Sequence, residues 1–166
     1  MNTDSAESIL TSVFIGVHLW FLFLRLLHRL ARVGEQFLFG ALEFDGPAVI
    51  NCYTTCQPEH GVADNMASEQ ARLAVDTRAF PLLIHDPRAG ATLKKRLSLQ
   101  GNPAMKEDWF TNPKTGETVD FIDFCRSEGR FSKHFDKEGN ASALLQQARD
   151  DRLENWHILQ ELAGLR

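Results

Sequence analysis

The chain has 166 residues, of which 43% are hydrophobic, and its formal net charge is −4 at pH 7. This length suits one domain with a real core and hardly two, so we expect one domain with an N-terminal appendage. The acidic balance and the scattered basic residues offer no field for a polyanion, which argues against nucleic acid as a partner. Three cysteines without a CxxC pair do not resemble a disulfide-rich secreted domain, so a reducing cytoplasm is the expected compartment.

The first 33 residues differ in composition from the rest. Residues 9–24, "ILTSVFIGVHLWFLFL", are almost wholly apolar and are followed by several basic residues. Residues 9–30 are therefore a candidate membrane anchor, although the run is shorter than the roughly 20 apolar residues that a bilayer core requires. An apolar helix that packs on the domain or on a partner is an equal alternative. We divide the chain into a hydrophobic helix at residues 1–33 and a folded domain at residues 34–166.

The next segments predict an α/β unit. Residues 35–44 form a short predicted helix that ends at the Asp-Gly-Pro turn. Residues 47–55, "PAVINCYTT", are a continuous β-rich run, which is typical of a strand buried on both faces of a parallel sheet. Side-chain alternation places Cys52 and Cys56 on the same face of this strand.

A helix is predicted within residues 63–80, with Asp64 as a candidate N-cap and an apolar stripe that includes Met66 and Ala74. Residues 80–87 return to a strand that ends at Asp-Pro. Strand, helix and strand in this order predict a βαβ unit with parallel pairing.

The remainder predicts loops followed by helices. Residues 93–117 are rich in Gly, Pro and Asn, and we expect few regular elements there. Residues 118–135 have amphipathic helical spacing with Cys125 in the core, and their charged stretch reads as a solvated face. Residues 142–165 form the clearest helix, with Ser142 as cap, Gly164 as stop and Trp156 as a core anchor.

Cys52, Cys56 and His60 have spacing that invites a zinc interpretation. In an extended strand, however, the Cα atoms of residues 52 and 56 stand roughly 13 Å apart, which prevents both thiolates from binding one zinc ion and also excludes a disulfide. Cys52 is then interpreted as a small buried residue, whereas Cys56 lies where a strand ends and ligands of open α/β sheets bind. His60 is interpreted as a solvent-exposed turn residue rather than a group that orients a substrate carboxylate or a cluster-proximal loop. His85 and Asp86 lie where a βαβ unit presents ligands, and Asp before Pro is equally a routine turn starter.

The stretch "GPAVINCYTTC", "EHG", "EQARLAV" and "IHDPR" resembles the late part of the thiamine-diphosphate domain of the pyruvate:ferredoxin (flavodoxin) oxidoreductases. The family pattern is GPS, an apolar run, YAPC and HG, then a helix with EQxxLAV and a strand that ends in YDPR. The resemblance extends from about residue 42 to the C-terminus, and the N-terminal apolar segment has no counterpart. It implies an incomplete thiamine-diphosphate-type parallel sheet with C-terminal helices.

The resemblance implies that Cys56 is a ligand of the [4Fe-4S] cluster nearest the thiamine. The other three cysteine ligands of the family lie upstream of the matched stretch, and the "GDG" and "NTGGQ" motifs that hold magnesium and the diphosphate do not occur here. The chain alone is therefore not expected to bind thiamine diphosphate, magnesium or the cluster.

In this family a 2-oxoacid such as pyruvate and coenzyme A yield acyl-CoA and carbon dioxide, and electrons pass to ferredoxin or flavodoxin. The resemblance predicts a subunit or truncated piece that needs the remaining part of the oxidoreductase and is inactive alone. The alternative is a small, non-catalytic α/β binding protein, with or without a membrane tether. A zinc module that uses Cys56 and His60 is a weaker third hypothesis.

Overall fold

The computed structural model describes residues 38–166 of the chain. The chain divides into two units, residues 1–51 and 52–166, each described here by itself. In the first unit, residues 38–42 are helical, as predicted, and residues 47–51 have no regular secondary structure. The predicted boundary at residue 33 and the apolar residues 9–30 lie outside the described residues. Between residues 38 and 166, no helix combines the length and apolar content that a membrane crossing requires.

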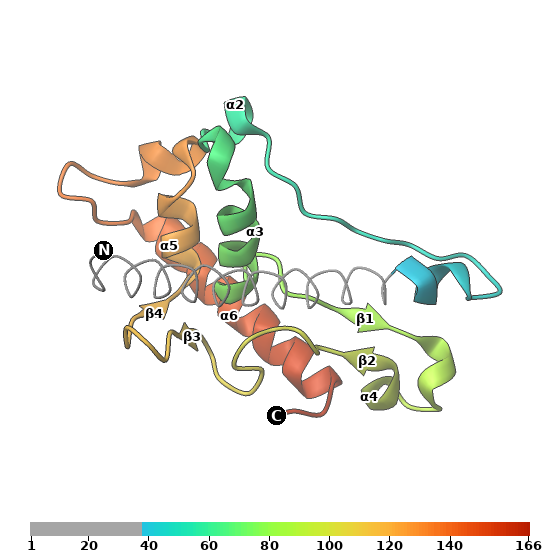
Figure 1. Ribbon diagram of the computed structural model, residues 1–166. Helices are drawn as coiled ribbons and strands as arrows, with labels where there is room; N and C mark the ends of the chain where they lie inside the picture. The colour runs from blue at the N-terminus through green and yellow to red at the C-terminus, as the bar shows by residue number, and fades with distance from the viewer. Residues whose placement is uncertain (1–37) are drawn as a thin grey trace, which may run out of the picture. The chain divides into compact units, whose positions relative to one another are not determined.

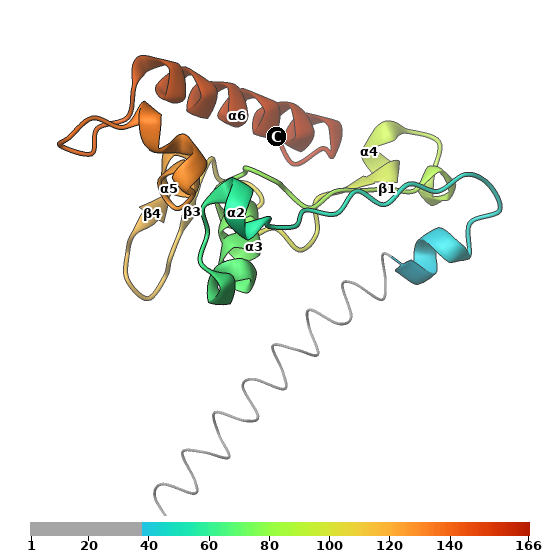
Figure 2. The same cartoon turned by 90° about the horizontal axis from the view of Figure 1, so that it is seen from above.

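The second unit combines helices with two small antiparallel sheets (Figures 1 and 2). One sheet pairs β1 with β2, and the other pairs β3 with β4. Helix α3 lies beside α5 in both views, and α6 is the longest helix. The bounds are η1 Asp64–Met66, η2 Pro87–Ala89, η3 Gly129–His134, β1 Ile84–His85, β2 Leu97–Ser98, β3 Phe110–Thr111, β4 Thr118–Val119, α2 Gln57–His60, α3 Ala67–Asp76, α4 Leu93–Arg96, α5 Phe121–Arg126 and α6 Ala143–Leu162.

The predicted βαβ unit with a parallel sheet is not present in the described residues. The strand prediction for residues 47–55 is wrong, because these residues have no regular secondary structure and residues 45–52 are exposed throughout. Val49 is 93% exposed. The second predicted strand is reduced to β1, which pairs antiparallel with β2. A β-rich composition forms a strand only where neighbouring backbone completes its hydrogen bonds, and no segment within residues 38–166 does so for residues 47–55.

The core lies where α3, α5 and the start of α6 meet. Its buried side chains come from all three helices: Ala74, Ile122, Phe124, Cys125 and Leu145. The predicted core position of Cys125 is confirmed, since it is fully buried. Helix α5 begins with a capping box. The Asp120 side chain accepts from the Ile122 N–H, and the Asp123 side chain accepts from the Asp120 N–H. Strand β4 ends just before this cap. The helix therefore begins at residue 121 and not at residue 118, where the predicted helical spacing begins.

Helix α6 confirms its predicted cap and stop, whereas α3 confirms only the helix itself and the buried position of Ala74. Ser142 caps α6 through the N–H of Leu145, and Gly164 has a φ of 68° just beyond its end, as expected of a stop. Helix α3 is shorter than predicted, because Asp64 begins a 3-10 turn instead of capping the helix. Met66 is 37% exposed, so its place in the apolar stripe is wrong.

Candidate functional site

Cys56 lies at the junction between an extended segment and α2. It is the N-cap residue of that helix, with extended backbone angles of φ −110° and ψ 104°, and its thiol is free and exposed. From residue 52 to residue 56 the exposure alternates: Cys52, Thr54 and Cys56 are exposed, whereas Tyr53 and Thr55 are half-buried. The predicted alternation is therefore present over these five residues, although no strand pairs with them in the described part of the chain.

The buried carboxylate of Glu128 lies close to polar groups from residues before and after Cys56 in the chain. Glu128 is 1% exposed, and its Oε1 accepts hydrogen bonds from the Tyr53 hydroxyl at 2.9 Å and the Gln70 amide at 3.0 Å. The Arg130 guanidinium donates to Oε2. Nδ1 of His60 is buried without a hydrogen-bond partner and lies 3.7 Å from Oε1. We call Glu128 with these four residues the Glu128 cluster.

The backbone after His60 approaches the backbone after Glu128 very closely. Gly129 N–H donates to the carbonyl of Gly61 at 3.4 Å. Gly61 adopts a left-handed φ of 65°, and a Cβ atom there would lie 2.9 Å from Cα of Gly129. The His-Gly pair at the end of α2 therefore packs against the Glu-Gly pair at the start of η3, which gives the "HG" motif a structural reason.

The cluster changes the acid–base properties of two nearby groups. Burial, followed by the hydrogen bond to Glu128, raises the pKa of Tyr53 to about 12. Burial, with the nearby Glu128 charge second, raises the pKa of the Cys125 thiol to about 12. Cys125 thus stays a protonated core residue, and Cys52 and Cys56 are the exposed thiols.

The other predicted positions have plain outcomes. Cys52 is exposed, so its interpretation as a buried residue is wrong. The interpretation of His60 as an exposed turn residue is also wrong, because its side chain is only 17% exposed and faces Glu128. His85 is exposed, and Asp86 caps the turn η2 by accepting from the Arg88 N–H, which confirms its turn role.

Sequence reasoning missed Glu128, because its stretch "RSEGRF" reads as a solvated charged face. Charged residues are rarely buried unless they are paired. Arg130 is a nearby partner, but the two residues that donate to Oε1 at hydrogen-bond distance lie 58 and 75 residues away in the chain. The "HG" and "EQ" signals contain His60 and Gln70, two members of the cluster, but do not show that they meet.

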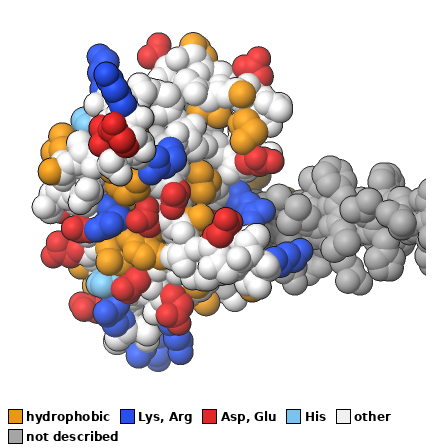
Figure 3. All heavy atoms as spheres, turned by 90° about the vertical axis from the view of Figure 1, so that its left-hand side faces the viewer, with side chains coloured by type: hydrophobic (Ala, Val, Ile, Leu, Met, Phe, Trp, Pro, Cys, Tyr) orange, Lys and Arg blue, Asp and Glu red, His pale blue; other side chains and the backbone are white. Residues whose placement is uncertain are grey.

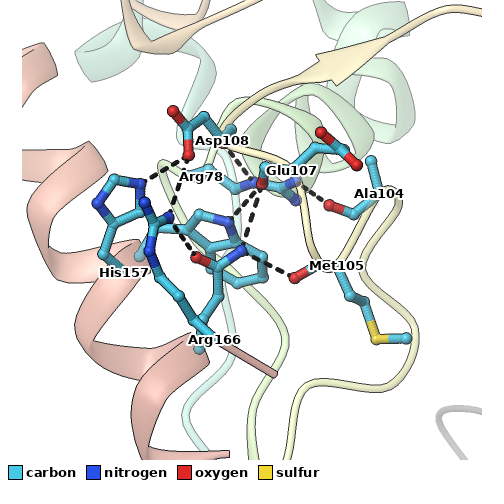
Figure 4. A network of polar contacts seen from close by, with 9 residues as sticks. Arg78, Ala104, Met105, Glu107, Asp108, His157 and Arg166 are labelled. Carbon is cyan, nitrogen blue, oxygen red and sulfur yellow. Dashed lines mark hydrogen bonds and ion pairs between the residues drawn. The ribbon is translucent and has the colours of Figure 1, made fainter. Parts of the chain in front are cut away.

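A second buried network joins α6 to the loop that precedes β3 (Figure 4). The Arg78 guanidinium stacks 4.1 Å from the ring centre of Trp156 and donates to the Ala104 carbonyl at 3.0 Å. Trp156, 1% exposed, donates its indole N–H to the Glu107 carbonyl, which confirms it as an anchor. Burial lowers the pKa of Arg78 to about 10. The network holds backbone carbonyls, so we regard it as structural.

The described residues contain no group of three or more His, Cys, Asp or Glu side chains that could hold a metal ion. A [4Fe-4S] cluster takes four thiolates, whereas the chain has three cysteines and one of them, Cys125, is buried. The cysteines of this chain alone therefore cannot hold a whole cluster, and the exposed Cys56 thiol fits as a single ligand. Basic and acidic side chains are mixed on the face that Figure 3 shows.

Comparisons with protein-family models, with curated proteins and with solved structures found no match to this chain.

Proposed function

We propose that the chain is a subunit or fragment of a thiamine-diphosphate- and iron–sulfur-dependent 2-oxoacid oxidoreductase and works only together with the remaining part of that enzyme. The observation that carries this proposal is the exposed thiol of Cys56. It ends an extended segment whose backbone pairs with no strand among the described residues. An unpaired extended segment that ends in a free thiol is what one part of a divided cofactor cleft requires, because ligands of open α/β sheets bind where strands end.

The exposure of the preceding residues supports the same proposal. Val49 is 93% exposed and Ile50 is 45% exposed, although their run has the composition of a buried strand. In the complete enzyme we expect residues 47–55 to join a parallel sheet that the remaining part of the oxidoreductase provides. Exposed apolar side chains next to unpaired backbone favour such an addition, because it buries the side chains and satisfies the amides together.

The division of ligands follows from the residues present. Cys56 would supply one thiolate to the [4Fe-4S] cluster, and the remaining part would supply the other three together with the groups that hold magnesium and thiamine diphosphate. Electrons would leave through the complex to ferredoxin or flavodoxin. We place this complex in the cytoplasm, with residues 9–30 as the segment that would hold it at a membrane.

The test is co-expression of the full chain with the upstream domains of a pyruvate:ferredoxin oxidoreductase under anaerobic conditions. We expect the two parts to purify together, to contain iron and acid-labile sulfide, and to reduce a viologen dye when pyruvate and coenzyme A are added. In Cys56→Ser we expect the two parts to remain together with about four iron atoms fewer per complex, because one cluster loses a ligand.

The matched control is Cys52→Ser, which removes a second exposed thiol four residues earlier on the same face. It should retain the iron content and dye reduction of the parent. Failure of the two parts to associate, or equal iron loss in both serine variants, would count against the proposed function. Zinc in stoichiometric amount in the chain alone would instead support the zinc module.

A further inference from the structure

We propose that Glu128 is the positioning residue for Cys56: its buried carboxylate binds Tyr53 before this thiol, the backbone directly after it binds Gly61 beyond the thiol, and the two contacts fix where the sulfur lies. The use of Cys56 as a cluster ligand rests on the proposed function, but the positioning itself is a property of this chain. No sequence motif predicted it.

The two contacts stand on either side of the thiol. Tyr53, three residues before Cys56, donates its hydroxyl to Glu128 Oε1 at 2.9 Å. His60, four residues after Cys56, places Nδ1 3.7 Å from the same oxygen without a hydrogen bond to it. The side chains of Tyr53 and His60 therefore both face Glu128, and Tyr53 is the one that is hydrogen-bonded to Oε1, with the exposed Cys56 between them in the chain.

Backbone contacts make this loop stiff. The His60 N–H donates to the carbonyl of Cys56 at 2.8 Å, and the Gly61 N–H donates to the carbonyl of Gln57 at 2.9 Å. The close approach of Gly61 to Gly129 adds a contact directly after Glu128. A displacement of Glu128 is thus transmitted to α2 and, through its first hydrogen bond, to Cys56.

The carboxylate itself is held in place from the other side. Gln70 donates to Glu128 Oε1, and its own Oε1 accepts from the Ser127 hydroxyl at 2.9 Å, which sets the orientation of the amide. Arg130 donates to Oε2 and compensates the buried charge. A neutral amide at position 128 would place its N–H groups either toward Arg130 or toward the Tyr53 and Gln70 donors, so glutamine is not an equivalent substitute.

The test uses the full chain in a Cys52→Ser background, where Cys56 is the one remaining exposed thiol because Cys125 is buried. A nitroxide attached to Cys56 reports the motion of this residue in its electron paramagnetic resonance spectrum. In Tyr53→Phe and in Glu128→Gln we expect narrower lines than in the parent. Amide exchange at His60 and Gly61 should become about tenfold faster, because a buried hydrogen bond to a charged group is lost.

Tyr53→Phe keeps the ring that contacts Phe80 and Phe124, so it preserves the packing even if Glu128→Gln fails to fold. The matched control is Thr77→Val, which removes a buried hydroxyl bond to the Leu73 carbonyl at 2.6 Å, away from the Glu128 cluster. A purely structural loss of stability would appear in this control as well, but the Cys56 spectrum should not change.

Nitroxide spectra of folded Tyr53→Phe that superimpose on the parent spectrum would overturn the positioning role. An equal effect in Thr77→Val would also overturn it. The measurement needs no cluster and no partner, so it keeps its meaning if the co-expression experiment fails. Conversely, a correct positioning role with no iron in the complex would contradict the proposed function alone.

Discussion

Tyr53 is the only tyrosine in the chain, and it reports directly on the Glu128 cluster. Its hydroxyl donates to a carboxylate that is almost completely removed from water, so ionisation would place two negative charges side by side. Burial and this hydrogen bond together raise its pKa to about 12. A tyrosinate titration therefore measures whether the cluster is assembled in solution.

We expect the absorbance of tyrosinate near 295 nm, recorded immediately after a jump to alkaline pH, to titrate with a midpoint near 12 in the folded chain. The pKa in the folded state is higher than the ordinary value of about 10 in the unfolded state. The stability that this difference provides is thus complete below about pH 10 and is lost as the pH rises through about 12. Slow unfolding should follow the jump and release the remaining tyrosinate signal.

Glu128→Gln provides the comparison for this titration. It removes the negative charge beside the phenol, so the pKa of Tyr53 should decrease toward its ordinary value although the ring stays buried. An ordinary midpoint in the parent chain would show that the cluster does not form. An unchanged midpoint in Glu128→Gln would show that burial alone perturbs Tyr53.

At the level of residues, helical periodicity identified core side chains of α5 and α6, whereas no sequence pattern identified the buried charged residues. Cys125 and Trp156 were predicted in the core because helical periodicity marks buried apolar side chains, and both are buried. Glu128 and Arg78 were missed, since a charged residue is buried only where distant partners satisfy it. Gln70 and Glu128 are 58 residues apart, so no local sequence pattern shows that they meet.

At the level of elements, the capping residues of α6 made this helix predictable. The state of residues 47–55 was not predictable, because it depends on whether another segment pairs with them. Helical hydrogen bonds close within the segment, so Ser142 and Gly164 suffice to mark its ends. A strand closes its hydrogen bonds on another segment, and residues 47–55 have none in the described part of the chain. The same composition therefore yields an exposed extended segment here and would yield a strand where a sheet is present.

The contact between α2 and the start of η3 can be tested by one methyl group. Gly61→Ala places a Cβ atom 2.9 Å from Cα of Gly129 and also carries the cost of a left-handed φ of 65°. We expect the free energy of unfolding to decrease by roughly 2–4 kcal/mol, the sum of conformational strain and overpacking. Urea unfolding monitored by circular dichroism measures this change.

Gly116→Ala is the matched control for the contact. Gly116 has a similar φ of 73° but no neighbouring atom within 4 Å of the added Cβ. This variant should lose only the conformational part, about 1–2 kcal/mol. Equal losses in the two variants would mean that the backbones at residues 61 and 129 separate without cost, and the close approach would then contribute nothing to the position of α2.

On the scale of the whole molecule, the segment before α2 has backbone amides without partners among residues 38–166. No backbone amide of residues 48–55 donates a hydrogen bond to another described residue. The α6 amides, in contrast, are bonded within the helix. Complex formation should therefore change amide exchange in the first segment and leave the second unchanged.

We expect the amides of residues 48–55 to exchange at nearly unprotected rates in the chain alone and to slow markedly in the co-expressed complex. The pattern of protection also distinguishes two arrangements. Addition at the edge of a sheet protects alternate amides, because only one side of the strand is paired, whereas insertion between two strands protects all of them. Mass-spectrometric exchange with fragmentation resolves the pattern, and α6 serves as the internal reference. Unchanged exchange at residues 48–55 in a complex that purifies as one species would contradict strand addition and would require that the two parts associate through another surface.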